Sequence, residues 1–209
     1  TDLGLISSDN CGVTGANYDI SQFDCDDVGV QNLVIDVFDA SGNTTSCTSQ
    51  VMVIDTVKPD VQCQDVSVTL DASGMASISV SDALISGSDN CPGTSYALSK
   101  SSFDCTDVGT QLVTLTATDA SGNTEQCTFV VTVNDNTAPT VQCQDLTLSI
   151  GSSGTVSIQA SDVVLAYQDN CSGVSLIVSE TNFDCADVGV NTVTVSATDA
   201  SGNSSNCTA

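Results

Sequence analysis

The sequence predicts an all-β protein made of tandem copies of a small β-sandwich, and three observations support this prediction. Ser, Thr and Val dominate the composition while aromatic residues reach only 4%, a mixture that favours strands over helices. Short stretches in which apolar and polar residues alternate are separated by turn residues. Cysteines recur at a constant 80-residue step, as Cys11, Cys91 and Cys171 show.

The strands follow in order within one repeat. Val66 begins an alternating stretch, the residues Asp-Ala-Ser-Gly then make a turn, and a second alternating stretch follows. About seven short strands in each 80-residue repeat, with turn signals every eight to twelve residues, are typical of a small β-sandwich. The clearest predicted strands cover residues 66–70, 76–80, 96–98, 112–118 and 128–133.

The repeats set the predicted domain boundaries. The sequence Asp-Ala-Ser-Gly-Asn occurs at 39–43, 119–123 and 199–203. Pro59 and Pro139 follow short polar stretches and mark junctions. We therefore predict a partial domain at 1–57 that lacks its first strands, a complete domain at 58–137, and a domain at 138–209 that lacks the end of its last strand. A longer repeating chain is the expected context.

Charge excludes several functions. The chain has 26 acidic residues, of which 24 are Asp, two basic residues and no His, which gives a net charge of −24. Nothing in it could neutralise nucleic-acid phosphates. Histidine bases, histidine-activated nucleophiles and histidine metal sites are absent as well. No apolar run is long enough to span a membrane. The prediction is a non-enzyme that has no nucleic-acid partner and no membrane insertion.

Several motifs resemble one family. Pro-x-Val-x-Cys, Asp-Asn-Cys, a Phe followed by Val-Gly, and Ala-Thr-Asp-Ala-Ser-Gly-Asn are together similar to the hyalin repeat (HYR). That module is an immunoglobulin-like domain found in tandem in extracellular adhesion and matrix proteins. The resemblance implies tandem immunoglobulin-like β-sandwiches, one for each 80-residue repeat, stapled by disulfides and arranged end to end. Cys63 and Cys143 are followed by Gln where Pro is usual, and the cysteine of Phe-Asp-Cys is an addition to the common pattern.

Four cysteines per repeat allow three pairings. Cys63 and Cys127 are expected on neighbouring first and last strands of the sandwich, and Cys91 and Cys105 flank a short excursion. The rival scheme pairs Cys47 with Cys63 and Cys127 with Cys143. The favoured scheme pairs Cys11–Cys25, Cys63–Cys127, Cys91–Cys105, Cys143–Cys207 and Cys171–Cys185, with Cys47 bound to a cysteine before residue 1. Such dense cysteines predict an extracellular or cell-surface, secreted location.

The aspartates have two interpretations. Asp suits turns, and a strongly negative surface keeps a polymer soluble. Alternatively, clustered oxygen ligands near the junctions bind Ca²⁺. Residues 134–139 look like the calcium-binding linker of cadherins, whereas the 54–59 junction lacks their Asn residues and carries Lys58. The candidate ligands are Asp119, Asp135, Asn136 and Asp199. No cofactor other than Ca²⁺ is predicted.

Short sequence signals also nominate sites for glycosylation. Asn43 and Asn203 lie in Asn-x-Ser/Thr acceptor sequences, and Asp55-Thr56-Val57 is similar to an O-glycosylation signal of bacterial secreted proteins. The dense Ser and Thr residues are otherwise interpreted as solvated strand residues.

The leading functional hypothesis is a structural or adhesive extracellular protein whose repeats form a stalk or fibre. Its partners are then repeats of the same kind joined end to end, together with surface glycans or other cells. The first alternative is a calcium-dependent ligand-binding module, either lectin-like or for cell adhesion. The second is a spacer attached to a secreted enzyme outside this sequence.

Overall fold

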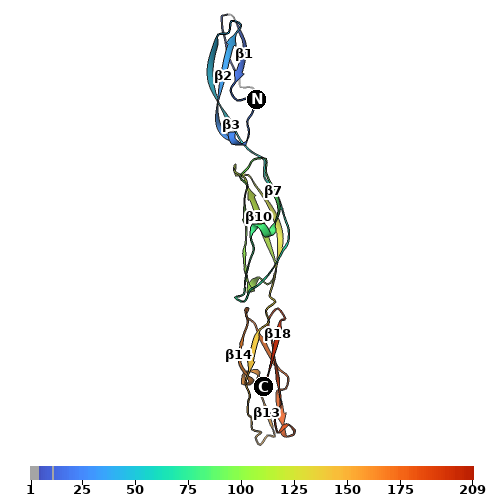
Figure 1. Cartoon of the computed structure of the whole chain (residues 1–209). Coiled ribbons are helices and arrows are strands. Elements are labelled where there is room, and N and C mark those ends of the chain that lie inside the picture. The colour runs from blue at the N-terminus through green and yellow to red at the C-terminus, as the bar shows by residue number, and fades with distance from the viewer. Residues whose placement is uncertain (1–4, 11) are drawn as a thin grey trace. The chain divides into compact units, whose positions relative to one another are not determined.

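The computed structural model describes residues 5–10 and 12–209 and is built from strands, which confirms the all-β class (Figure 1). Helical segments are single turns of three or four residues. Within the described residues, no helix has the length and apolar character needed to cross a bilayer. Residues 1–57, 58–137 and 138–209 are called repeats 1, 2 and 3 below, as names for stretches of sequence.

Repeat 1 contains one antiparallel sheet in the order β1-β2-β3. In Figure 1, β2 and β3 run side by side, and their register extends from Gly29 opposite Val53 to Phe38 opposite Thr44. The elements are β1 (Val13–Tyr18), the 3-10 turn η1 (Cys25–Asp27), β2 (Gly29–Asp39) and β3 (Thr44–Val53).

Repeat 2 carries the largest number of strands. Four of them form a sheet in the order β5-β11-β10-β8, in which β11 and β5 are parallel, and β4-β7 and β6-β9 form two-stranded pairs. The elements are β4 (Asp60–Cys63), β5 (Val66–Thr69), β6 (Met75–Ser77), α1 (Val80–Ala83), β7 (Leu84–Ser88), β8 (Ser95–Leu98), β9 (Ser102–Asp104), η2 (Cys105–Asp107), β10 (Gly109–Thr118) and β11 (Thr124–Asn134).

Repeat 3 repeats part of this pattern. Its sheets are β12-β14, β13-β16 and β15-β17-β18. The elements are β12 (Thr140–Cys143), β13 (Thr155–Ser157), α2 (Ala160–Val163), β14 (Val164–Gln168), β15 (Ser175–Val178), β16 (Asn182–Asp184), η3 (Cys185–Asp187), β17 (Thr194–Thr198) and β18 (Ser204–Thr208).

One alternating strand places the core in each repeat. Every second residue in the middle of β2 is buried, and the residues at the equivalent positions of the next two repeats are buried as well, because side chains of a strand alternate between two faces. β-branched and aliphatic side chains thus fill most of the interior, together with Phe103 and Phe129 in repeat 2. These residues are Leu33, Ile35 and Val37 in repeat 1, Val113, Leu115 and Ala117 in repeat 2, and Val193, Val195 and Ala197 in repeat 3.

The predicted strand at 76–80 ends earlier than its alternation indicated. β6 stops at Ser77, and Val80–Ala83 forms the helical turn α1. The Ser79 backbone N–H and hydroxyl both donate to Asp82 Oδ2, at 2.7 Å each. These two bonds from Ser79 to the Asp82 side chain stabilise the start of the turn and compete with extension of the strand.

The chain divides into two compact units. Unit 1 comprises Thr1–Gln62, Ser86–Ala97 and Thr116–Gln126. Unit 2 comprises Cys63–Ile85, Leu98–Leu115 and Cys127–Ala209. The boundaries predicted at 57/58 and 137/138, the immunoglobulin-like topology and the end-to-end arrangement all stay predictions.

Candidate functional site

Two groups of three aspartates are the most concentrated chemistry in the described residues. Asp55, Asp89 and Asp119 form the Asp119 cluster, and each offers one carboxylate oxygen within 4.8 Å of the other two. The Asp199 cluster consists of Asp135, Asp169 and Asp199 under the same limit. Each member of the second cluster follows its counterpart in the first by one 80-residue step. The same constellation is therefore built twice.

The hairpin loop at 119–123 positions Asp119. Its Oδ1 accepts from the Asn123 backbone N–H at 2.8 Å, and its Oδ2 accepts from Asn123 Nδ2 at 2.7 Å. Asp119 is only 5% exposed. Burial raises its pKa, but the hydrogen bonds from Asn123, Ser121 and Gly122 outweigh that effect and hold the pKa below its ordinary value. Asp119 is therefore ionised at neutral pH.

Asp89 and Asp55 reach the same place from two other segments. Asp89 Oδ2 accepts from the Cys91 backbone N–H at 3.1 Å. Asp55 Oδ1 accepts from the Val57 backbone N–H at 3.1 Å and from Asn90 Nδ2 at 3.2 Å. The other oxygen of each carboxylate, Asp89 Oδ1 and Asp55 Oδ2, is buried and has no hydrogen-bond partner among the described residues.

The Asp199 cluster has the same construction. The Asn203 backbone N–H and Nδ2 donate to the two oxygens of Asp199, at 2.8 Å each. Asp169 Oδ2 accepts from the Cys171 backbone N–H at 3.1 Å, and Asp169 Oδ1 is buried and unpartnered in the described part of the chain. Asp135 and Asp199 are 6% and 7% exposed.

No basic side chain neutralises either cluster. The chain has two basic residues, and each pairs with a different acid. Lys58 Nζ lies 3.6 Å from Glu125 Oε2, and Lys100 Nζ lies 2.5 Å from Asp107 Oδ1. Three carboxylates that converge without a cationic partner have the charge and the oxygen donors to bind a hard cation.

The predicted metal ligands have different outcomes. Asp119, Asp135 and Asp199 each lie in a cluster, and Asn136 is exposed and follows Asp135 directly in the chain. Sequence reasoning missed Asp55, Asp89 and Asp169. The 80-residue step could have found them, because Asp55 aligns with Asp135 and the Asp-Asn-Cys motif recurs at 89–91 and 169–171. Metal binding itself stays a prediction.

The cysteine pairing needs a correction. The structure contains two of the predicted bonds, Cys63–Cys127 and Cys143–Cys207. Cys25 bonds to Cys91 and Cys105 bonds to Cys171, so the predicted pairs Cys91–Cys105 and Cys171–Cys185 do not form. Cys11 lies outside the described residues, and its predicted partner Cys25 is taken by Cys91.

The physical reason lies in the segment between Cys91 and Cys105. The prediction treated it as a short excursion. It contains β8, which joins the sheet of β10, and β9, which pairs with β6. The segment therefore contributes strands to two different sheets, and Cys105 follows it as the first residue of η2. Cys47 and Cys185 are free and exposed.

The predicted glycosylation sites differ in access. Asn43 and Thr56 are exposed. Asn203 is partly buried, and its Nδ2 donates to the Asp135 carbonyl at 2.9 Å as well as to Asp199. That nitrogen is the atom to which an N-linked glycan would attach, so Asn203 is the least suited of the three. Glycosylation stays a prediction.

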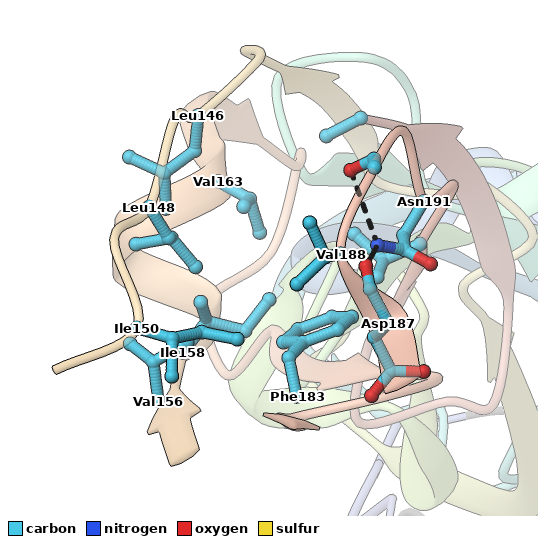
Figure 2. A pocket seen from close by; sticks show the side chains of 13 residues that line it. Leu146, Leu148, Ile150, Val156, Ile158, Val163, Phe183, Asp187, Val188 and Asn191 are labelled. Carbon is cyan, nitrogen blue, oxygen red and sulfur yellow. Dashed lines mark hydrogen bonds between the residues drawn. The ribbon is translucent and has the colours of Figure 1, made fainter. Parts of the chain in front are cut away.

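A separate pocket of about 400 Å³ lies in repeat 3 and is shown in Figure 2. Leu146 and Leu148 line it together with Phe183 and Val188. In repeat 2 the counterparts of the two leucines are Val66 and Val68 of β5, which pair with Val131 and Val133 of β11. In repeat 3, Leu146 and Leu148 lie outside the strands and line the pocket.

Comparisons with known proteins identify one module. Residues 54–133 match the family model of the HYR domain. An uncharacterized 81.3 kDa protein of Acholeplasma phage L2 is 30% identical over 190 residues, which cover 85% of this chain and 25% of the relative. The chain therefore spans about a quarter of that relative's length.

Solved structures with similarity to the chain include extracellular cadherin domains. Domains 1–4 of protocadherin gamma B7 have a TM-score of 0.38 and 15% identity, with 94% of this chain and 66% of that chain covered. Human CDH23 EC21-23 has a TM-score of 0.37 and 13% identity, with coverages of 86% and 73%. The family match thus covers the middle of the chain, where residues 54–133 are similar to the HYR domain.

Proposed function

We propose that this chain is a non-enzymatic extracellular module of structural and adhesive type, in which consecutive repeats are bonded in series to form a stalk or fibre. The observation that carries the proposal is the pair of disulfides Cys25–Cys91 and Cys105–Cys171. Each joins one sequence repeat to the next, and both obey the 80-residue step. Disulfides of this density belong to oxidising, extracellular compartments.

A bond of this kind has a mechanical role. Without it, consecutive repeats are connected only by the short segment around Pro59 or Pro139. With it, a load along the chain is carried by two covalent paths at each junction. The other bond in repeats 2 and 3, Cys63–Cys127 or Cys143–Cys207, joins two strands of the same repeat. One type of bond thus stabilises a repeat and the other connects repeats, a division suited to a fibre.

Small-angle scattering of the oxidised 209-residue chain tests the stalk. A globule of this length has a radius of gyration of about 17 Å. Three sandwiches of roughly 35–45 Å arranged in line would give about 30–40 Å, judging from strands of five to ten residues with their loops. A radius of gyration close to the globular value would contradict the fibre proposal.

Serine variants test the bonds that connect the repeats. Replacing Cys25, Cys91, Cys105 and Cys171 with Ser removes the connections between repeats. We expect this variant to show a broader distribution of end-to-end distances by electron microscopy while each repeat stays folded. Cys47→Ser serves as the control, because Cys47 is free and exposed. Equal rigidity in all three proteins would argue against the disulfides as connectors.

The second candidate function is calcium-dependent ligand binding or cell adhesion, and the two aspartate clusters favour it. Beads coated with the chain should then aggregate, or capture glycan-bearing cells, in millimolar Ca²⁺ and disperse when the Ca²⁺ is chelated. Aggregation that is indifferent to chelation would leave a purely structural role as the better account.

A further inference from the structure

We propose that the Asp119 cluster and the Asp199 cluster are two equivalent Ca²⁺ sites, each built from three separate chain segments. The proposal concerns the clusters themselves and does not depend on whether the repeats form a stalk. Its starting point is geometric. The three carboxylate oxygens of each cluster lie within 4.8 Å of one another. Oxygens that share one Ca²⁺ at 2.3–2.6 Å can be separated by at most about 5 Å, so this spacing suits a common cation.

Buried carboxylate oxygens without partners are the independent observation. Asp55 Oδ2 and Asp89 Oδ1 expose almost no surface and accept no hydrogen bond in the described residues. Asp169 Oδ1 is in the same condition in the Asp199 cluster. A buried, unpaired carboxylate oxygen is costly, because it loses its water without gaining a donor. One cation bound in each cluster would satisfy the unpartnered oxygens of that cluster.

The remaining hydrogen bonds are compatible with that role. Each cluster aspartate uses backbone N–H groups or the amide of a nearby Asn to hold its position. Asn170 Oδ1 is a further buried oxygen without a partner in the described residues. It lies beside the Asp199 cluster, since Asn170 Nδ2 donates to Asp135 Oδ1 at 3.2 Å. It is available as an additional neutral ligand.

Solvent can reach the second site. A cavity of about 490 Å³ is lined by Asp135, Asn136 and Asn203 and by the Cys105–Cys171 pair. It gives a cation an approach to the Asp199 cluster and leaves room for the water molecules that usually complete a Ca²⁺ shell. Asn136, which the sequence also nominated as a ligand, lines this cavity.

The chemistry of the donors favours Ca²⁺ over other cations. All donors are oxygens, and neither cluster contains the nitrogen or sulfur ligands that Zn²⁺ prefers. Mg²⁺ gives up its water reluctantly and is seldom held by an all-protein cage. Ca²⁺ accepts several carboxylates and carbonyls in irregular geometry. Extracellular Ca²⁺ sites commonly have dissociation constants of about 0.1–1 mM, and we expect that range here.

Asp89→Asn and Asp169→Asn are the decisive variants. In each, the amide oxygen can still accept from the backbone N–H of Cys91 or Cys171, while an NH₂ group replaces the unpartnered oxygen. The fold is therefore expected to survive. Asp145→Asn is the charge-matched control, because Asp145 is exposed and outside both clusters.

Equilibrium dialysis of the oxidised 209-residue chain at 5 mM free Ca²⁺ gives the readout. We expect two bound Ca²⁺ per chain in the wild type and in Asp145→Asn, one in each cluster variant, and none in the double variant. Thermal melting gives a second readout. Ca²⁺ should raise the wild-type melting temperature by roughly 5–10 °C, because it binds the folded state. In chelator, the cluster variants should melt at or above the wild-type temperature, because a like charge is gone.

Three results would overturn the proposal. The first is less than one bound Ca²⁺ per wild-type chain at 5 mM. The second is an unchanged stoichiometry in the double variant, which would assign the ions to the diffuse charge of −24. The third is an equal rise in melting temperature with NaCl at matched ionic strength, which would mean screening alone. The same measurements in MgCl₂ should show weaker binding; equal binding would remove the assignment to Ca²⁺.

Discussion

The hairpin loops at 39–43 and 119–123 have the same five residues, Asp-Ala-Ser-Gly-Asn, and make the same internal hydrogen bonds. Asn43 donates to Asp39 through its backbone N–H at 2.8 Å and through Nδ2 at 2.7 Å, as Asn123 does to Asp119. The pKa of Asp39 and that of Asp119 are both lowered by these bonds, against the effect of burial. The local structure is the same in both repeats.

Their surroundings differ. Asp119 is 5% exposed and belongs to a carboxylate cluster, whereas Asp39 is partly exposed and belongs to no such group among residues 5–10 and 12–209. The difference comes from a distant segment. Asp55 and Asp89, from other segments of the chain, join Asp119 of the second loop. A loop sequence thus orients one carboxylate, and the cluster requires three segments.

The largest expected difference between these two regions concerns the cysteine on the strand after each loop. Cys127 of β11 bonds to Cys63, and its counterpart Cys47 of β3 is free. Replacing Cys63 and Cys127 with Ser should lower the free energy of unfolding of repeat 2 by about 4 kcal/mol, since the bond closes a loop of 64 residues. Hydrogen exchange across a urea series, resolved by peptide, would report each repeat separately.

Cys47→Ser is the control for that experiment. It should change the stability of repeat 1 by less than about 0.5 kcal/mol, as exposed substitutions usually do. A comparable loss in both variants would mean that the thiol contributes by packing and that the Cys63–Cys127 crosslink has no special effect.

An intermediate effect is expected at the asparagine that closes each loop. Asn123 Nδ2 donates to the Asp55 carbonyl at 3.1 Å in addition to Asp119, whereas Asn43 Nδ2 donates to Asp39. Asn123→Ala should therefore cost about 1 kcal/mol more than Asn43→Ala, because it also leaves a partly buried carbonyl without its donor. Urea unfolding in chelator measures both without a contribution from cations. Equal losses would show that the contact with Asp55 adds nothing.

The smallest expected effect concerns the positive charge of Lys100, which is absent from the corresponding position of the other two repeats. Lys100 bonds Asp107 in repeat 2, while the corresponding residues are Ile20 in repeat 1 and Glu180 in repeat 3. The hydrogen bond from Lys100, then that from the Asp104 backbone, hold the pKa of Asp107 below its ordinary value of 3.8. A carboxyl with a lowered folded-state pKa stabilises the fold above its ordinary pKa, and this contribution is lost as pH falls through the lowered value.

Lys100→Met removes the ammonium group, which pairs with Asp107 and lies 5.3 Å from the centroid of the Phe103 ring. The variant should be slightly less stable than the wild type at pH 6, and the two should converge as the pH falls below about 3.8 and Asp107 takes up its proton. Thermal melting from pH 6 to pH 2 would measure this convergence. A gap that stays constant across that range would assign the effect to packing.

The strands and the clustered aspartates show what sequence reasoning finds and what it misses. Alternation predicted the strand that contains Val113 and Leu115, because a strand with one buried face must carry apolar residues at every second position. It overextended the strand at 76–80, because the Asp82 cap acts on a local turn that alternation does not register. Asp119, Asp135 and Asp199 stood out as turn and linker residues. Asp55, Asp89 and Asp169 did not, since no short motif contains all three aspartates of one cluster.

The sequence by itself determined the 80-residue period, the all-β class, the turn at each Asp-Ala-Ser-Gly-Asn and the acidic charge, because each depends on residues close together in the chain or on composition alone. Only the tertiary structure decided that Cys25 meets Cys91 rather than Cys11, and that three aspartates from residues 55 to 119 share one place. Those outcomes depend on which sheet each strand joins. β8 and β9 belong to different sheets, and the spacing of the cysteines does not indicate which sheet a strand joins.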